Sequence, residues 1–127
     1  MDGGCKILLW LFAVLGSLVS FGERVTVLHT NDIHGKIGRK GALSYAQVAA
    51  YRDGLRVQGE AVVLVDAGDF SHGSPMGKID KGESLTRIMN AAGYEAATIG
   101  NHEFDYGRDK FFETVSNYNF PILSCNF

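Results

Sequence analysis

Three short segments of the sequence contain most of the side chains that could bind metal ions or transfer protons. They are Asp32-Ile33-His34, Gly68-Asp69 and Gly100-Asn101-His102. Carboxylate and amide oxygens favour hard cations, whereas imidazole nitrogen favours Zn²⁺, Mn²⁺, Fe or Ni²⁺. A carboxylate such as Asp69 has two oxygens and can bridge two ions about 3.5–4 Å apart, the arrangement for in-line displacement at phosphorus. Together the segments predict a divalent-metal site suited to phosphate chemistry.

Each of these segments follows a run of residues that predicts a β-strand. The expected strands are residues 24–28, 61–65, 95–99 and 120–125. The expected helices are residues 42–56, residues 83–92 and a short segment from Asp109. Residues 33–41 and 71–82 are interrupted by glycine and are expected to be loops. The order βαβαβαβ predicts an α/β fold with helices packed on the faces of the sheet. The continuous apolar run at 61–65 predicts a strand covered on both faces.

A parallel sheet brings the carboxyl ends of its strands to one edge, where ligands of such folds bind. Each segment also has a simpler explanation, because Asp-x-His is a common sequence and an Asp or Asn after a strand often caps a helix. The occurrence of all three at successive strand ends favours one shared site. His29 is expected to be packed or hydrogen-bonded and His72 to lie on the surface, while Glu103 and Asp66 are expected to be structural.

The length and charge of the chain limit the classes of protein to which it can belong. Its 127 residues suffice for one domain with a single hydrophobic core. The net charge is −2, so a nucleic-acid polymer is not an expected partner.

Residues 1–22 are predicted to be an export signal, and residues 23–127 the folded portion. Ile7 to Val19 is a nearly unbroken apolar run, shorter than the roughly 20 residues that a membrane-spanning helix needs. Ser20-Phe21-Gly22 then supplies small residues for cleavage. An uncleaved membrane anchor is the alternative. The protein is therefore expected in the periplasm, outside the cell or at the cell surface, where Cys125 would be its one remaining cysteine.

Longer segments around these residues resemble a known family. Residues 27–35, 65–69 and 97–107 resemble the 5′-nucleotidase branch of the calcineurin-like metallophosphoesterases, and the resemblance extends from Glu23 to Phe127. The phrase Asn-His-Glu-Phe-Asp, from Asn101 to Asp105, is typical of that branch. The resemblance implies the N-terminal part of a four-layer αββα sandwich with a dinuclear metal site between its two sheets.

The resemblance also implies a role for each candidate residue. Asp32 and His34 resemble ligands of one metal ion, Asp69 the bridging carboxylate, and Asn101 a ligand of the other ion. The two ions would be divalent, from among Zn, Mn, Co, Fe, Mg and Ca. His102 resembles the catalytic histidine that faces the phosphate, and Asp105 the acid that orients it.

The activity implied is hydrolysis of nucleotide phosphate esters by water activated at two metal ions. On the same scaffold, 2′,3′-cyclic-nucleotide phosphodiesterase, UDP-sugar hydrolase and sulfur-ester hydrolase activities stay open, because metal ligands do not select among substrates. The family completes its site with further histidines, including a Gly-His-x-His segment, and no histidine follows His102 here. We therefore expect an N-terminal, truncated portion of a phosphoesterase that turns over little substrate alone. A truncated, non-catalytic product that binds metal or nucleotide is the other reading.

Overall fold

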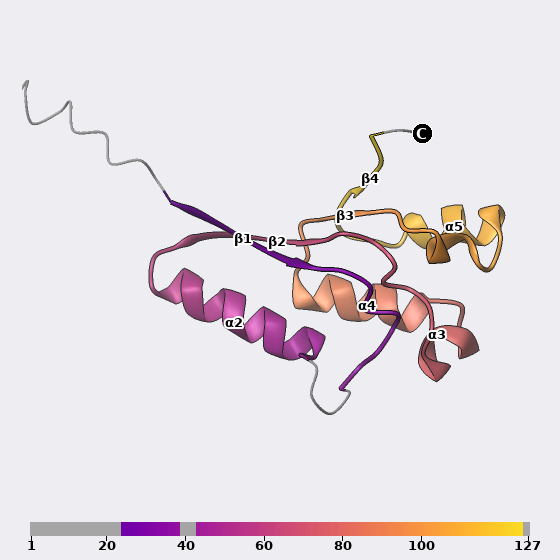
Figure 1. Ribbon diagram of the computed structural model, residues 1–127, viewed down its shortest axis with the longest axis horizontal. Helices are drawn as coiled ribbons and strands as arrows, with labels where there is room; N and C mark the ends of the chain where they lie inside the picture. The colour runs from indigo at the N-terminus through magenta and orange to yellow at the C-terminus, as the bar shows by residue number, and fades with distance from the viewer. Residues whose placement is uncertain (1–23, 39–42, 126–127) are drawn as a thin grey trace, which may run out of the picture.

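The structure is a computed structural model that describes residues 24–38 and 43–125. The predicted export signal at 1–22 and the predicted helix start at Ala42 lie outside the described residues. The described strands and helices, in chain order, are β1 (Val25–Thr30), α2 (Tyr45–Val57), β2 (Ala61–Asp66), α3 (Pro75–Ile79), α4 (Glu83–Ala92), β3 (Ala96–Thr98), the 3₁₀ turn η1 (His102–Phe104), α5 (Arg108–Val115) and β4 (Ile122–Leu123) (Figure 1).

The four strands form one parallel sheet in the order β1-β2-β3-β4. Val27 pairs with Val63, and Thr30, at the end of β1, pairs with Asp66 at the end of β2. Because every strand runs in the same direction, the loops that follow β1, β2 and β3 leave the sheet at one edge. The α/β order predicted from the sequence is confirmed.

Helix α2 spans Tyr45–Val57 and so begins later than the predicted residues 42–56, because Ser44 caps it. Ser44 accepts the backbone N–H of Gln47, and the Gln47 side chain accepts the backbone N–H of Ser44, which forms a capping box at the start of α2. Helix α4 has the predicted bounds and ends at Gly93, whose φ of 71° is a left-handed conformation that glycine adopts without a steric penalty. The buried Arg52 of α2 donates to the carbonyl oxygens of Ala92 and Gly93, so the end of α4 is fixed to α2.

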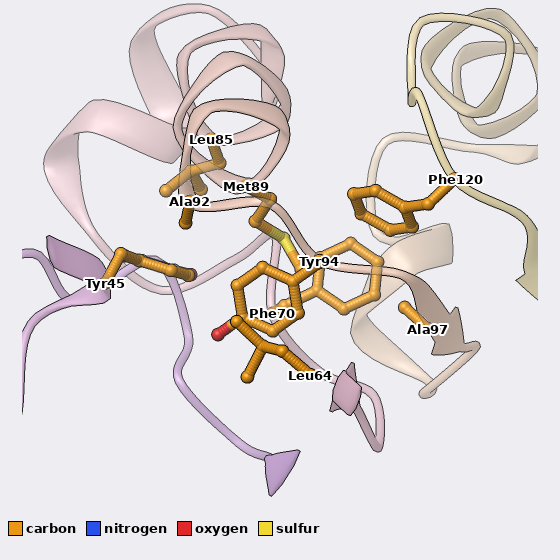
Figure 2. Close-up of a cluster of buried hydrophobic side chains, with 9 residues drawn as sticks. All are labelled: Tyr45, Leu64, Phe70, Leu85, Met89, Ala92, Tyr94, Ala97 and Phe120. Atoms are coloured by element: carbon orange, nitrogen blue, oxygen red, sulfur yellow. The ribbon is translucent and has the colours of Figure 1, made fainter. Parts of the chain in front are cut away.

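Helices α2 and α4 lie on the same side of the sheet (Figure 1). The core consists of side chains from these helices, the strands and the connecting loops. Leu64, Leu85 and Met89 have no exposed surface, and burial of one such side chain contributes about 1.5–3 kcal/mol. Figure 2 shows the nine residues of this cluster, which are Tyr45, Leu64, Phe70, Leu85, Met89, Ala92, Tyr94, Ala97 and Phe120. The core therefore holds β2 and the loop that follows it against α4.

The opposite face of the sheet is less covered within the described part of the chain. Val25 and Val27 are 56% and 61% exposed. In β2, Val62 and Leu64 are buried whereas Val63 is half-buried, so the prediction that this strand is covered on both faces is not met among these residues. His29 was predicted to be packed or hydrogen-bonded, and its exposed position on β1 contradicts the packing.

A short helix, α3, occupies part of the predicted loop at 71–82. Ser74 accepts the backbone N–H of Gly77 at 3.1 Å and so caps the helix, and Pro75 supplies a φ suited to its first turn. The glycines at 73 and 77 concealed this signal in the sequence. Among the described residues, no helix is both long and apolar enough to cross a membrane. Cys125 is a free, exposed thiol.

Candidate metal centre

The loop after β1 runs alongside the loop after β2 and is hydrogen-bonded to it. Asp32 donates its backbone N–H to Gly68, and His34 donates its own to the carbonyl oxygen of Asp69, at 3.0 and 2.9 Å. Gly35 continues the series by donating to Phe70 at 2.9 Å. These bonds extend the pairing of β1 with β2 beyond the ends of the strands, so the two loops have a fixed register.

Three of the predicted ligands have left-handed backbone conformations. Asp32, His34 and Asp69 have φ values of 51°, 51° and 56°, and Lys81 is the other non-glycine residue with positive φ in the described ranges. This conformation costs roughly 1–2 kcal/mol per residue relative to the right-handed one. Such strain concentrates at functional sites, where the surrounding contacts hold it in place. Here it turns the side chains of His34 and Asp69 toward one place.

His34, Asp69 and His102 form a group that could hold a metal ion. Each offers one ligand atom, and the three atoms lie within 4.8 Å of one another. Asp32 is outside this group of three, but its carboxylate lies 3.5 Å from Nε2 of His34 and is exposed. Asn101 is exposed immediately before His102, at the start of η1. Two imidazoles and a carboxylate suit a divalent transition metal. Two of the three, His34 and Asp69, are predicted ligands, whereas His102 was predicted to be catalytic.

Asp69 is also hydrogen-bonded to the loop after β3. Its Oδ1 accepts the backbone N–H of His102 at 2.9 Å. The loop approaches so closely that a Cβ on Gly100 would lie 2.1 Å from this oxygen and 2.6 Å from the Asp69 backbone nitrogen. Only glycine therefore fits at position 100 without displacing the carboxylate, which explains why a glycine precedes the Asn-His pair.

His102 and Asp105 form the pair that the sequence predicts. Nδ1 of His102 lies 3.0 Å from Oδ2 of Asp105 across the 3₁₀ turn η1. This hydrogen bond raises the pKa of the His102 imidazole above its ordinary value and lowers that of the Asp105 carboxyl. An ionised carboxylate at Nδ1 leaves Nε2 of His102 free to face a ligand or substrate.

Glu103 is the buried residue that joins the second and third loops. Its carboxylate accepts the backbone N–H groups of Asp69, Phe70, Ser71 and Gly100, at 2.7–3.1 Å, and the hydroxyl of Ser71 at 3.0 Å. The prediction that Glu103 is structural agrees with this position, but the structure that it supports is the site itself. No sequence periodicity marks such a residue, because three of the four backbone N–H groups lie 32–34 positions away.

Asp66, at the end of β2, is a second buried carboxyl beneath the loops. Its oxygens accept the Thr30 hydroxyl at 2.5 Å and the backbone N–H of Gly68 at 2.8 Å. Burial raises the pKa of Asp66 to about 6, and these hydrogen bonds only partly oppose the effect. Thr30 also contacts the hydroxyl of Tyr94 at 2.8 Å. Asp66 therefore fixes the bend where β2 meets its loop.

His72 was predicted to lie on the surface, and the structure shows that this was wrong. Only 6% of the residue is exposed, and its ring packs on that of Tyr106 with 4.2 Å between centroids. The contact joins residues 34 positions apart in sequence, so local pattern gave no sign of it. Its position three residues after Asp69, in the same loop, was the available signal.

Comparison with known proteins identifies the family of the chain. The profile of the Calcineurin-like phosphoesterase family matches residues 25–127. The chain is 36% identical over 109 residues to the 5′-nucleotidase of Vibrio parahaemolyticus and 38% identical over 109 residues to protein UshA of Escherichia coli. Each alignment covers 81% of this chain and 20% of the relative, so the chain spans about a fifth of the length of these relatives.

The fold comparison gives the same result. The structure of Haemophilus influenzae NAD nucleotidase superposes with a TM-score of 0.69 and 27% identity, over 80% of this chain and 20% of that one. The predicted metallophosphoesterase fold class is therefore confirmed, with the described residues forming one sheet and the helices on it. The chain belongs to the calcineurin-like phosphoesterase family, on its 5′-nucleotidase branch.

Proposed function

We propose that the protein containing this chain hydrolyses nucleotide phosphate esters with the help of two divalent metal ions. The observation that carries the proposal is the convergence of His34, Asp69 and His102 at the carboxyl edge of the sheet. The names of the relatives support the nucleotide as substrate, since they include a 5′-nucleotidase and an NAD nucleotidase.

The chain's own residues would hold the ions and the phosphate group in a fixed arrangement. Asp32 and His34 would bind one ion, Asn101 the other, and Asp69 both. Bound divalent ions neutralise phosphate charge and lower the pKa of water. The hydrogen bonds from the loop after β1 to Gly68 and Asp69 keep the ligands of the two ions in one register.

His102 would act on the phosphate rather than on the metal ions. Its pKa is raised by the hydrogen bond to Asp105, so a larger share of the imidazole is protonated near neutral pH. The Nε2–H could then donate to a phosphate oxygen or to the leaving oxygen, which stabilises charge that develops during the reaction. Asp105 would keep the proton on Nδ1 and so fix which nitrogen faces the substrate.

The test is a phosphatase assay on the full natural polypeptide that contains this sequence. A panel of nucleoside 5′-monophosphates, 2′,3′-cyclic nucleotides, UDP-glucose and a sulfur ester is incubated with Mn²⁺ or Zn²⁺, and the products are measured. Release of inorganic phosphate from 5′-monophosphates, its loss with a chelator and its return with added metal support the proposal. Preference for a cyclic nucleotide or UDP-sugar would refute the nucleotidase assignment, and activity that survives chelation would refute metal dependence.

The 127-residue chain alone is expected to bind metal weakly and to hydrolyse little substrate. We propose this because Asp32, His34, Asp69 and Asn101 are too few to complete the coordination of two metal ions. The same assay on the isolated chain tests it, and turnover comparable with that of the full polypeptide would contradict it.

We also propose that residues 1–22 direct export and that a nucleotide outside the cytoplasm is the substrate. The support is the apolar run from Ile7 to Val19. N-terminal sequencing of the protein recovered from a culture tests this. A mature N-terminus at Glu23 supports cleavage, whereas an intact N-terminus in the membrane fraction supports an anchor.

A further inference from the structure

The Asp105 carboxylate faces a second imidazole besides that of His102. Its Oδ2 lies 3.0 Å from Nδ1 of His102 and 3.7 Å from Nε2 of His72. The longer distance is within ion-pair range but beyond an ordinary hydrogen bond. Oδ2 of Asp105 is thus shared by a half-exposed histidine of the site and a buried histidine behind it.

The His72 ring is held in this position from several sides. It packs on Tyr106, the residue that follows Asp105, and lies nearly parallel to the ring of His102, at an interplanar angle of 21° and 6.3 Å between centroids. On the other side, Gly73 lies so close to His34 that a Cβ there would come within 2.8 Å of the His34 Cβ. The loop that carries His72 therefore fills the space behind the candidate metal ligands.

The polar atoms of His72 have few alternatives to Asp105. Nε2 is buried and has no hydrogen-bond partner among the described residues. Nδ1 lies 3.4 Å from the oxygen of the Ser71 hydroxyl, whose single proton is donated to Oε1 of Glu103 at 3.0 Å. Burial lowers the pKa of His72, which favours a neutral ring with a single N–H.

The orientation of that N–H follows from its neighbours. A lone pair on Nε2 would face the Asp105 carboxylate and be repelled by it, whereas an N–H would be attracted. An N–H on Nδ1 would instead face the uncharged oxygen of Ser71. The charged carboxylate of Asp105 is the stronger acceptor of the two, so the N–H is expected on Nε2.

We propose that His72 is a positioning residue for the proposed phosphoester hydrolysis. Its Nε2–H holds the Asp105 carboxylate in place, so that Asp105 orients His102. The inference rests on the proposed function for its effect on catalysis, but the contact between the two histidines and Asp105 does not depend on it. His72 is buried behind Asp105 and would act through Asp105.

Two substitutions separate positioning from packing. His72→Phe keeps a ring against Tyr106 but has no N–H, whereas His72→Gln can present an amide N–H toward Asp105. His29→Gln is the matched control, because His29 is exposed on β1. In the full natural polypeptide, His72→Phe is expected to lower kcat about tenfold with little change in KM, His72→Gln to restore most of it, and His29→Gln to have no effect.

A second readout does not require activity. Histidine-selective ¹⁵N NMR of the same proteins reports which ring nitrogen of His102 carries the proton. The wild-type protein and His72→Gln are expected to hold the proton of His102 on Nδ1, and His72→Phe to show a mixture of the two tautomers. This result would support the inference even if no nucleotide were hydrolysed, an outcome that would refute only the proposed function.

Two outcomes would overturn the inference. An unchanged tautomer of His102 in His72→Phe would mean that His72 does not act through Asp105. Equal loss of kcat in His72→Phe and His72→Gln, with a lowered Tm in both, would mean that His72 only fills space.

Discussion

The carboxylate of Glu103 accepts the backbone N–H of Asp69 at 3.0 Å, although the two residues are 34 positions apart. The same carboxylate oxygen accepts the N–H of Gly100 at 2.7 Å. The loop with the candidate bridging carboxylate and the loop with the candidate catalytic histidine are thus joined through one buried side chain. The relative position of Asp69 and His102 is therefore fixed by contacts within the chain.

Glu103→Gln is expected to destabilise the chain by about 1–3 kcal/mol, because an amide NH₂ would face backbone donors and leave at least one unsatisfied. Urea denaturation measures the free energy of unfolding. Glu113→Gln is the control, because Glu113 is exposed and pairs with Lys110, so its loss should change stability by less than about 1 kcal/mol. Equal effects of the two substitutions would contradict the role given to Glu103.

Gly100→Ala is expected to weaken metal binding by about tenfold or more, because the new Cβ would overlap Oδ1 of Asp69 and displace it. Calorimetric titration of the full natural polypeptide with Mn²⁺ measures the affinity. Gly54→Ala is the control, since a Cβ on Gly54 of α2 would meet nothing within 4 Å. That change should leave metal affinity unaltered and raise stability by about 0.5–1 kcal/mol. Unchanged affinity in Gly100→Ala would remove Asp69 from the ligands.

Asp69→Asn and His102→Ala are expected to separate metal binding from catalysis. Loss of the Asp69 charge should lower metal content and activity together, whereas His102→Ala should lower activity about 10²–10⁴-fold and leave both ions bound. Elemental analysis of the purified variants, with a phosphate-release assay, measures the two effects. Because His102 lies within the three-residue group, loss of metal from His102→Ala is the result that would make it a ligand instead.

Asp66 is expected to make stability fall as pH rises through weakly acidic values. Burial raises its pKa to about 6 in the folded chain, against about 3.9 when unfolded. Between these values the folded chain binds more protons, so the free energy of unfolding decreases as pH rises from about 4 to about 6, by up to about 3 kcal/mol. Asp66→Asn should lack this part of the pH dependence. Urea denaturation of both proteins from about pH 4 to about pH 7 measures their free energies of unfolding. The same pH dependence in both would refute the role given to Asp66.

The parts of the fold that local pattern determines could be predicted from the sequence. Helix α4 has the expected bounds because Gly93 supplies a left-handed residue at its end, and β1, β2 and β3 lie where their apolar runs predicted them. The positions of Asp32, His34 and Asp69 at strand ends followed from this. Helix α3 was missed because its cap, Ser74, lies between glycines that are typical of a loop.

The features that depend on contacts between distant segments could not be predicted. The burial of His72 depends on Tyr106, and the importance of Glu103 depends on N–H groups of the loop after β2. Coverage of β2 on one face only, among the described residues, depends on which other elements pack on the sheet. Apolar content alone does not reveal that.

The left-handed conformations of Asp32, His34 and Asp69 have a consequence for how this sequence can change. A chain selected for stability alone would place glycine at such positions, since glycine adopts positive φ without the penalty that a Cβ brings. Glycine, however, carries no oxygen or nitrogen that could reach a cation. At these three positions, a substitution that increases stability would remove a candidate metal ligand. Stabilising mutations found there are therefore expected in relatives that have lost metal binding.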